Sequence, residues 1–319
     1  MRNVTRLLAG LLVSTACAHA FGAWPDKPIK LVVPFPPGGG TDVVARLVAQ
    51  KMSEELGVPV VIDNKPGADT QIGTGLVARS PADGYTIGIV TPSLAINKTL
   101  YAKTITYDPI KDFTPISLVA STPFYLAVGA QTPYKTASEL VNASRQPNAH
   151  ITYGTASSIG YLSGEQTRQA LNLQAEHIPY KGSAASVTAV ASGELTYTVD
   201  TILAMRSLAQ AGKLRILGVS SGQRAKAYPD IPALNETWKG FEVVSWWGLV
   251  APAGIPEEAV SKMNAALSKS LSTPEMRTKF EELGAEPNYA NAQRFATVIR
   301  ESLVSYEQTI KAVKLEPGR

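Results

Sequence analysis

A run of three glycines at residues 38–40 is the segment of this sequence best suited to hold an anion. It follows an apolar run at residues 29–33 that is typical of a buried strand. Thr41 or Asp42 can then cap a helix. Since the first N–H groups of a helix lack internal partners and lie at the positive end of its dipole, a carboxylate fits there. A purely structural turn explains the glycines equally well, and neither GxGxxG nor GxxxxGK[ST] indicates a nucleotide.

The same arrangement of strand, small polar residues and helix start occurs again in the second half of the chain. A strand expected at residues 150–153 is followed by a loop of small residues at 154–160, and a helix is expected over 161–171. The hydroxyl groups of Thr155, Ser157 and Ser158 add donors to the free backbone N–H groups. The sequence therefore predicts a second site for an anion or a polar group.

Other candidate pocket residues follow the remaining strands. Asp69 and Ser93 come after strands expected at 58–63 and 85–90, and Asp200 ends a strand expected from residue 195. Loops after parallel strands meet at the sheet edge where open α/β sheets bind ligands. For Asp69 and Ser93 a turn or capping role is an equal alternative. Lys181 fits a solvated lysine better than a pocket cation.

Catalytic groups are not assembled in any recognisable pattern. A nucleophile at Ser157 would need a base, and His150 is at the far end of the preceding strand. Asp42 and Asp200 could act as an acid and base pair only if the fold brought them together. With His177 as the one other histidine outside the leader, we expect no enzyme, no metal site and no cofactor.

The first 22 residues are typical of a secretory signal. They combine a charged start, an apolar centre at residues 7–16 and a small-x-small cleavage sequence that ends at Ala20, with cleavage after Gly22 as a second option. A lipoprotein attached through Cys17 is less consistent, because Ser14 stands where an aliphatic residue is usual. We therefore expect a periplasmic protein without a disulfide, since Cys17 is the one cysteine.

Size and composition support a globular chain with about two domains, since it has 319 residues of which 45% are hydrophobic. The formal charge of +4 includes two arginines of the leader. No basic tract is present, so we expect no nucleic acid as a partner.

Alternating strands and helices predict two α/β units, each with a parallel sheet and right-handed crossovers. Extended segments at 116–128 and 243–250 connect the units, and helices are expected at 256–271, 274–283 and 292–313. Such a clamshell binds its ligand between the units and closes by a hinge motion. Two opposed helix starts would hold an elongated molecule with a carboxylate at one end and a carboxylate or neutral group at the other.

Several longer motifs resemble those of the Bug family, the extracytoplasmic substrate-binding proteins of tripartite tricarboxylate transporters. They occur in the family's order over almost the whole mature chain, and include PFPPGGGTDVVARLVAQKM, VPVVIDNKPGADTQIG, YKGSAAS, RAKAYPDIPALNE and WWGLVAPAGIPEE. The resemblance implies a two-domain periplasmic-binding-protein fold of the Venus-flytrap, type II-like class. Residues 23–124 plus 245–319 would form domain 1, and residues 125–244 would form domain 2.

The resemblance also implies a function. The protein would capture a small carboxylate and deliver it, as a monomer, to the integral-membrane permease subunits of the transporter. A ligand-sensing subunit of a two-component receptor is the alternative. The family's ligand loops, together with the candidates above, give these ligand-binding residues: Phe35, Pro37, Gly38, Gly39, Gly40, Thr41, Asp42, Asp69, Ser93, Thr155, Ala156, Ser157, Ser158, Tyr161 and Asp200.

Two departures from the family pattern concern the ligand. Tyr161 stands where the family usually has histidine, and the usual PGAGG is replaced by Pro66-Gly67-Ala68-Asp69-Thr70. An acidic side chain at the cleft edge repels a dianion and attracts an ammonium group. We therefore expect the ligand to be an amino acid, or a compact aromatic or amide-type acid, instead of a plain tricarboxylate.

Overall fold

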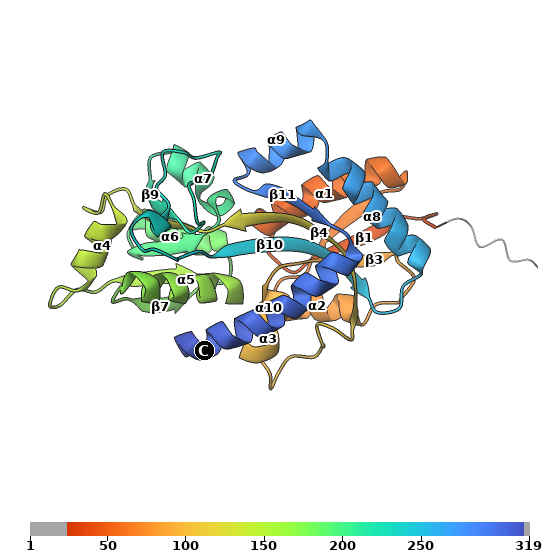
Figure 1. The fold of residues 1–319 in the computed structure, drawn as a ribbon, viewed down its shortest axis with the longest axis horizontal. Coiled ribbons are helices and arrows are strands. Elements are labelled where there is room, and N and C mark those ends of the chain that lie inside the picture. Colours follow the sequence, from red (N-terminus) through yellow and green to blue (C-terminus); the bar gives the residue numbers. More distant parts are fainter. Residues whose placement is uncertain (1–23, 316–319) are drawn as a thin grey trace, which may run out of the picture.

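The computed structural model describes residues 24–315, and the expected leader with Cys17 lies outside these residues. The chain forms two α/β lobes that lie side by side, with long strands running between them (Figure 1). The two-lobed α/β class predicted from the sequence is therefore confirmed.

The first lobe is built on a six-stranded sheet. Its strands, in spatial order, are β11 (Glu286–Ala290), β4 (Phe113–Pro123), β10 (Val244–Pro252), β3 (Thr86–Val90), β1 (Ile29–Val33) and β2 (Val60–Asn64). Its helices are α1 (Gly40–Leu56), α2 (Gln71–Ala78), α3 (Ser93–Leu100), α8 (Glu257–Leu271), α9 (Pro274–Glu282) and α10 (Ala292–Val313). Strand β1 is buried on both faces, as its apolar sequence requires.

The second lobe contains a five-stranded sheet. Its strands, in spatial order, are β7 (Glu176–Pro179), β6 (Thr152–Thr155), β8 (Tyr197–Asp200), β5 (Tyr125–Gly129) and β9 (Leu214–Val219). Its helices are α4 (Ala137–Ser144), α5 (Ser158–Leu171), α6 (Ser183–Ser192), α7 (Ile202–Gln210) and the short 3-10 helix η1 (Leu234–Glu236).

Both sheets are mixed, so the expectation of purely parallel sheets is wrong. Strand β1 pairs in parallel with β2 and β3, but β10 pairs antiparallel with β3 and β4. In the second lobe β5 is antiparallel to β8 and β9. The reason lies in the two connections, because β4 leaves the first lobe and β10 returns to it, so these neighbours run in opposite directions.

The last helix spans both lobes (Figure 1). Ile310 and Val313, near its end, belong to the same apolar cluster as Leu162 of α5. The side chain of Gln169 also donates to the carbonyl oxygen of Val313 at 3.2 Å. Helix α10 therefore contacts the second lobe as well as the sheet of the first lobe, where Phe295 packs against Trp246. No helix within residues 24–315 combines the length and the apolar character needed to cross a bilayer.

Candidate ligand-binding site

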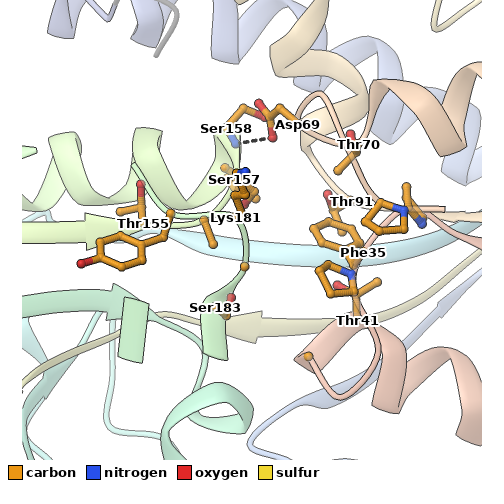
Figure 2. Close-up of a pocket in the computed structure, with 18 of the residues that line it drawn as sticks. Phe35, Thr41, Asp69, Thr70, Thr91, Thr155, Ser157, Ser158, Lys181 and Ser183 are labelled. Carbon is orange, nitrogen blue, oxygen red and sulfur yellow. Dashed lines mark hydrogen bonds between the residues drawn. The ribbon is translucent and has the colours of Figure 1, made fainter. Parts of the chain in front are cut away.

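A cavity of about 700 Å³ lies between the lobes, and most of the predicted site residues line it (Figure 2). The predicted residues that do so are Phe35, Pro37, Gly39, Gly40, Thr41, Asp69, Thr155, Ala156, Ser157, Ser158, Tyr161 and Asp200. Gly38, Asp42 and Ser93 are not part of the cavity wall. The sequence patterns missed several aromatic members of the wall, among them Tyr101, His177 and Trp247.

Asp42 fixes the shape of the glycine loop from behind. The residue is 2% exposed, and its carboxylate accepts hydrogen bonds from the backbone N–H of Gly38 at 3.0 Å, from Arg46 at 2.9 Å and from the Asn64 amide at 2.8 Å. The same Asn64 amide donates to the carbonyl oxygen of Phe35 at 3.1 Å. Burial opposes ionisation, but the hydrogen bonds from Arg46, Gly38 and Asn64 outweigh it, so the pKa of Asp42 lies below its ordinary value.

The expected capping of α1 by Thr41 or Asp42 is therefore wrong. Gly39 is the N-cap and provides no side-chain bond, while Asp42 stands in the first turn and binds backward to the loop. The Val43 N–H donates to the carbonyl oxygen of Gly39 at 3.1 Å, whereas the N–H groups that precede it in the helix have no carbonyl group one turn back to bond to. Gly39, Gly40 and Thr41 of this helix start line the cavity, and Thr41 lies on the right of the pocket in Figure 2.

Trp247 sets the hydrogen-bonding role of Thr41. Its indole N–H donates to the Thr41 hydroxyl oxygen at 3.0 Å. A hydroxyl group carries one proton and two lone pairs, so Thr41 keeps its proton for an acceptor in the cavity. The helix start and this hydroxyl group thus form one set of donors suited to a carboxylate.

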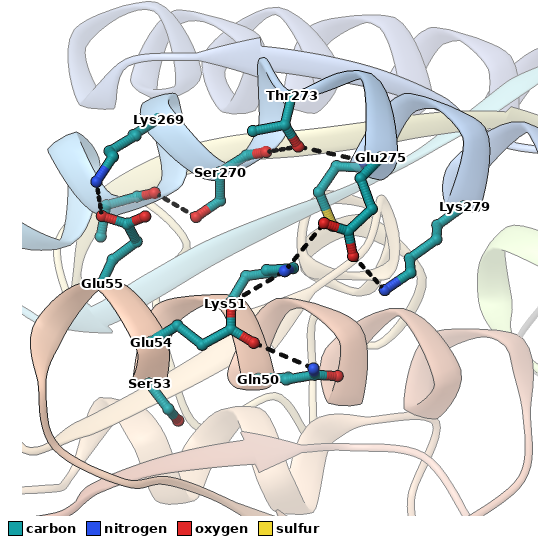
Figure 3. A network of polar contacts seen from close by, with 12 residues as sticks. Gln50, Lys51, Ser53, Glu54, Glu55, Lys269, Ser270, Thr273, Glu275 and Lys279 are labelled. Atoms are coloured by element: carbon teal, nitrogen blue, oxygen red, sulfur yellow. Dashed lines mark hydrogen bonds and ion pairs between the residues drawn. The ribbon is translucent and has the colours of Figure 1, made fainter.

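A surface network of ion pairs and hydrogen bonds links helix α1 to helices α8 and α9 (Figure 3). Lys51 of α1 contacts Glu275 of α9 at 3.4 Å, and Lys269 of α8 contacts Glu55 of α1 at 2.7 Å. Such exposed pairs contribute little stability individually. They nevertheless link helix α1, and therefore its N-terminus, to neighbouring elements of the same lobe.

The start of helix α5 is the second site predicted to bind an anion or a polar group. It begins at Ser158, three residues earlier than expected, and its N-cap Ser157 accepts a hydrogen bond from the Gly160 N–H at 3.3 Å. The backbone N–H of Ser158 donates to Asp69 at 2.8 Å, and its hydroxyl group donates to Ser93 at 2.8 Å. Asp69 and Ser93 belong to the first lobe, so both hydrogen bonds cross the cleft.

An aromatic layer lines the wall of the second lobe. The rings of Tyr161 and His177 stack with centroids 4.0 Å apart, and His177 Nε2 lies 2.7 Å from the Thr155 hydroxyl oxygen. Burial lowers the pKa of His177 to about 4, so the imidazole is neutral near pH 7. Its place in the wall comes from the pairing of β7 with β6, which no local sequence signal predicts.

Asp200 ends strand β8, as predicted, and lines the cavity together with Ser183 at the start of α6. Its carboxylate accepts a hydrogen bond from the Thr201 N–H at 2.7 Å. Burial raises the pKa of Asp200 to about 6, although the hydrogen bonds from Ser183 and Thr201 act in the opposite direction. Ionisation of this carboxylate therefore lowers the stability of the folded state.

Replacing Asp200 by asparagine is expected to stabilise the protein at pH 8 and to have a much smaller effect at pH 4. The folded state keeps this proton up to about pH 6, whereas the unfolded chain releases it near 3.8. Stability of the wild type consequently falls as the pH rises through this window, and the variant avoids a loss on the order of 1–3 kcal/mol. Thermal melts of dialysed protein at both pH values measure the effect. An equal difference at both pH values would contradict the role of burial, and Asp63→Asn on the surface is the control.

The lobes are in contact around the cavity. A Cβ atom built on Gly40 would lie 3.2 Å from the hydroxyl oxygen of Thr201 and 3.3 Å from Leu203, both in the second lobe. One built on Gly182 would lie 3.5 Å from Pro36 of the first lobe. The structure therefore shows a state in which the glycine loop approaches the opposite lobe closely.

Two further features concern metal binding and a serine-hydrolase motif. Residues 24–315 contain no group of three His, Cys, Asp or Glu side chains that could hold a metal ion. The expectation that no catalytic pattern is present is wrong in one respect, because residues 218–222 match the GxSxG pattern of serine hydrolases. However, the buried Ser220 donates to the carbonyl oxygen of Val243 and accepts from the Phe124 N–H at 2.8 Å, so it holds the two connections together.

Comparison with known proteins gives consistent results. The model of the family described as "Tripartite tricarboxylate transporter family receptor" matches residues 44–315. A protein of Pseudomonas sp. (strain P51), the UPF0065 protein in the tcbD-tcbE intergenic region, is 32% identical and covers 98% of this chain and 96% of its own length.

Two solved structures show the same architecture. The R. palustris protein Rpa4515 with adipate is 34% identical, with a TM-score of 0.89 over 92% of this chain and 100% of that chain. The periplasmic binding protein BugD is 32% identical, with a TM-score of 0.86 over the same shares of the two chains. The chain therefore belongs to the tripartite tricarboxylate transporter family of receptors, which are periplasmic solute-binding proteins of the Bug type.

Proposed function

We propose that this receptor captures a small organic acid between its lobes and binds the acid's carboxylate at the N-terminus of α1. The observation that carries this proposal is the helix start itself, because Gly39, Gly40 and Thr41 line the cavity and the Thr41 hydroxyl oxygen already accepts the Trp247 N–H. Hydrogen bonds to a charged oxygen contribute about 1.5–3 kcal/mol each. The related protein that was solved with adipate supports a solute of this class.

The rest of the function follows from the two-lobed fold. We assign the described part of 23–124 plus 245–319 to the first lobe and residues 125–244 to the second, with β4 and β10 as the hinge strands. Residues 1–22 direct export and are removed, which the intact mass of the exported chain tests. The receptor works as a monomer, releases its solute unchanged to the permease subunits, and carries out no chemistry on it.

Thr41→Val is expected to lower the affinity for organic acids by about 10- to 100-fold, the equivalent of one hydrogen bond to a charged group. Thr41→Ser keeps the hydroxyl group and should bind nearly as well as the wild type. Isothermal titration with adipate and shorter acids, at equal folded fraction judged by thermal melting, measures the difference. Mass spectrometry of the acid after incubation tests that it is released unchanged. Equal affinities of the valine variant and the wild type would show that the Thr41 hydroxyl group does not bind the acid.

A further inference from the structure

Asp69 lies on a loop with an unusual backbone. Three consecutive residues without a glycine, Ala68, Asp69 and Thr70, have φ values of 46°, 50° and 71°. Residues other than glycine adopt this left-handed region rarely and at an energetic cost. The Asn97 amide holds the loop by donating to the carbonyl oxygen of Asp69 at 2.7 Å. The position of the Asp69 side chain is therefore fixed by the first lobe.

The two oxygens of this carboxyl group have different surroundings. Oδ1 accepts the hydrogen bond from the Ser158 N–H across the cleft (Figure 2). Oδ2 is buried and has no hydrogen-bond partner. Burial raises the pKa of Asp69, and the smaller influence of the nearby Tyr101 hydroxyl group acts in the opposite direction without a hydrogen bond to Oδ2. No salt bridge within residues 24–315 involves Asp69.

This arrangement changes which hydrogen-bonding groups the start of α5 presents to a solute. The first N–H of α5 is occupied by the carboxyl group of Asp69, so a second carboxylate of a solute would meet another carboxyl group there instead of a free donor. A buried oxygen without a donor is costly, and a donor brought by a ligand relieves that cost. Asp69 therefore provides an acceptor where the sequence predicted a donor.

We propose that Asp69 Oδ2 binds an ammonium group at the end of the solute opposite its carboxylate. The ligand class is then an amino acid, with its carboxylate at α1 and its ammonium group at Asp69. This inference rests on the proposed function, because it assumes that the cavity holds an organic acid. An ammonium group from the solute would also pair with this carboxyl group. Burial raises the pKa of Asp69, and such a partner offsets the cost of its burial.

The test compares solutes that differ at one end. Titration calorimetry uses three chain lengths: succinate, 4-aminobutyrate and butyrate; glutarate, 5-aminopentanoate and pentanoate; adipate, 6-aminohexanoate and hexanoate. For at least one chain length the wild type should bind the amino acid at least tenfold more tightly than the dicarboxylate and the monocarboxylate. Asp69→Asn places an amide donor near the Oδ2 position and tolerates the left-handed backbone, so it should lose this preference and gain affinity for the dicarboxylate.

The outcomes separate the two proposals. Tighter binding of the dicarboxylate by the wild type at every length, unchanged in Asp69→Asn, would overturn the ammonium site and leave the proposed function intact. A loss of thermal stability in Asp69→Asn without any change in ligand preference would also overturn the ammonium site. Asp69 would then serve to stabilise the contact between the lobes. Absence of heat with all nine acids would contradict the proposed function itself. Asp63→Asn, on the surface of the same lobe, should behave as the wild type.

Discussion

Gly40→Phe is expected to lose affinity for organic acids by at least about 100-fold while keeping a folded structure. A phenyl ring on Gly40 would collide with Thr201 and Leu203, because even a Cβ atom lies within 3.2–3.3 Å of their atoms. The collision prevents the lobes from closing, so the solute loses the contacts of the second lobe. Two hydrogen bonds of about 1.5 kcal/mol each already correspond to about 100-fold in affinity. Titration calorimetry with the acid that the wild type binds best measures the loss.

Gly40→Ala provides a graded comparison for this prediction. Its methyl group requires the opposite lobe to move only by a few tenths of an ångström, so its affinity should lie between those of the wild type and Gly40→Phe. Gly40 begins helix α1 and does not need a positive φ, so neither variant strains the backbone. Solution scattering should show a more open shape for Gly40→Phe. Wild-type affinity in this variant would mean that binding does not require the closed state.

Asp42→Ala is expected to lower both stability and affinity. The substitution leaves the Gly38 N–H, the Asn64 amide and the Arg46 side chain without their shared acceptor. Loss of such a buried acceptor costs roughly 2–3 kcal/mol. The glycine loop also loses the contact that sets its shape, so binding should weaken at least about tenfold. Urea unfolding and calorimetry measure the two effects.

A matched control distinguishes this loss from a general effect of charge. Asp63 lies beside Asn64 on β2 and pairs on the surface with Lys30 and Lys65 at 3.9 and 3.0 Å. Asp63→Ala removes the same charge without touching the loop, so it should change stability and affinity little. Equal effects of the two substitutions would contradict the role assigned to Asp42.

The sequence predicted the parts of the site that depend on local chemistry. Strand β1, the glycine loop and helix α1 follow from one apolar run, three glycines and a periodic apolar face, and the structure contains all three in that order, with Gly39 as the helix N-cap. The hydroxyl-rich start of α5 was predicted in the same way, within three residues. These features require no knowledge of distant residues.

The features that the sequence did not predict depend on pairing between distant segments. Strand β11 contains proline, asparagine and glutamate and has no strand-like alternation, yet it pairs with β4. Trp247 was expected only as part of an extended crossing, but its bond to Thr41 joins residues 206 positions apart. The contact of Asp69 with Ser158 spans 89 positions, so a local pattern could show the acidic residue but not its partner.

A crystal structure of the protein with the best-binding of the nine acids tests the central claim most directly. The claim is that the solute lies between the lobes with its carboxylate at the start of α1. We expect a carboxylate oxygen within about 2.7–3.2 Å of the Thr41 hydroxyl oxygen and of a backbone nitrogen in the first turn of that helix. An acid bound outside the cavity between the lobes, or one whose carboxylate points away from the glycine loop, would contradict it.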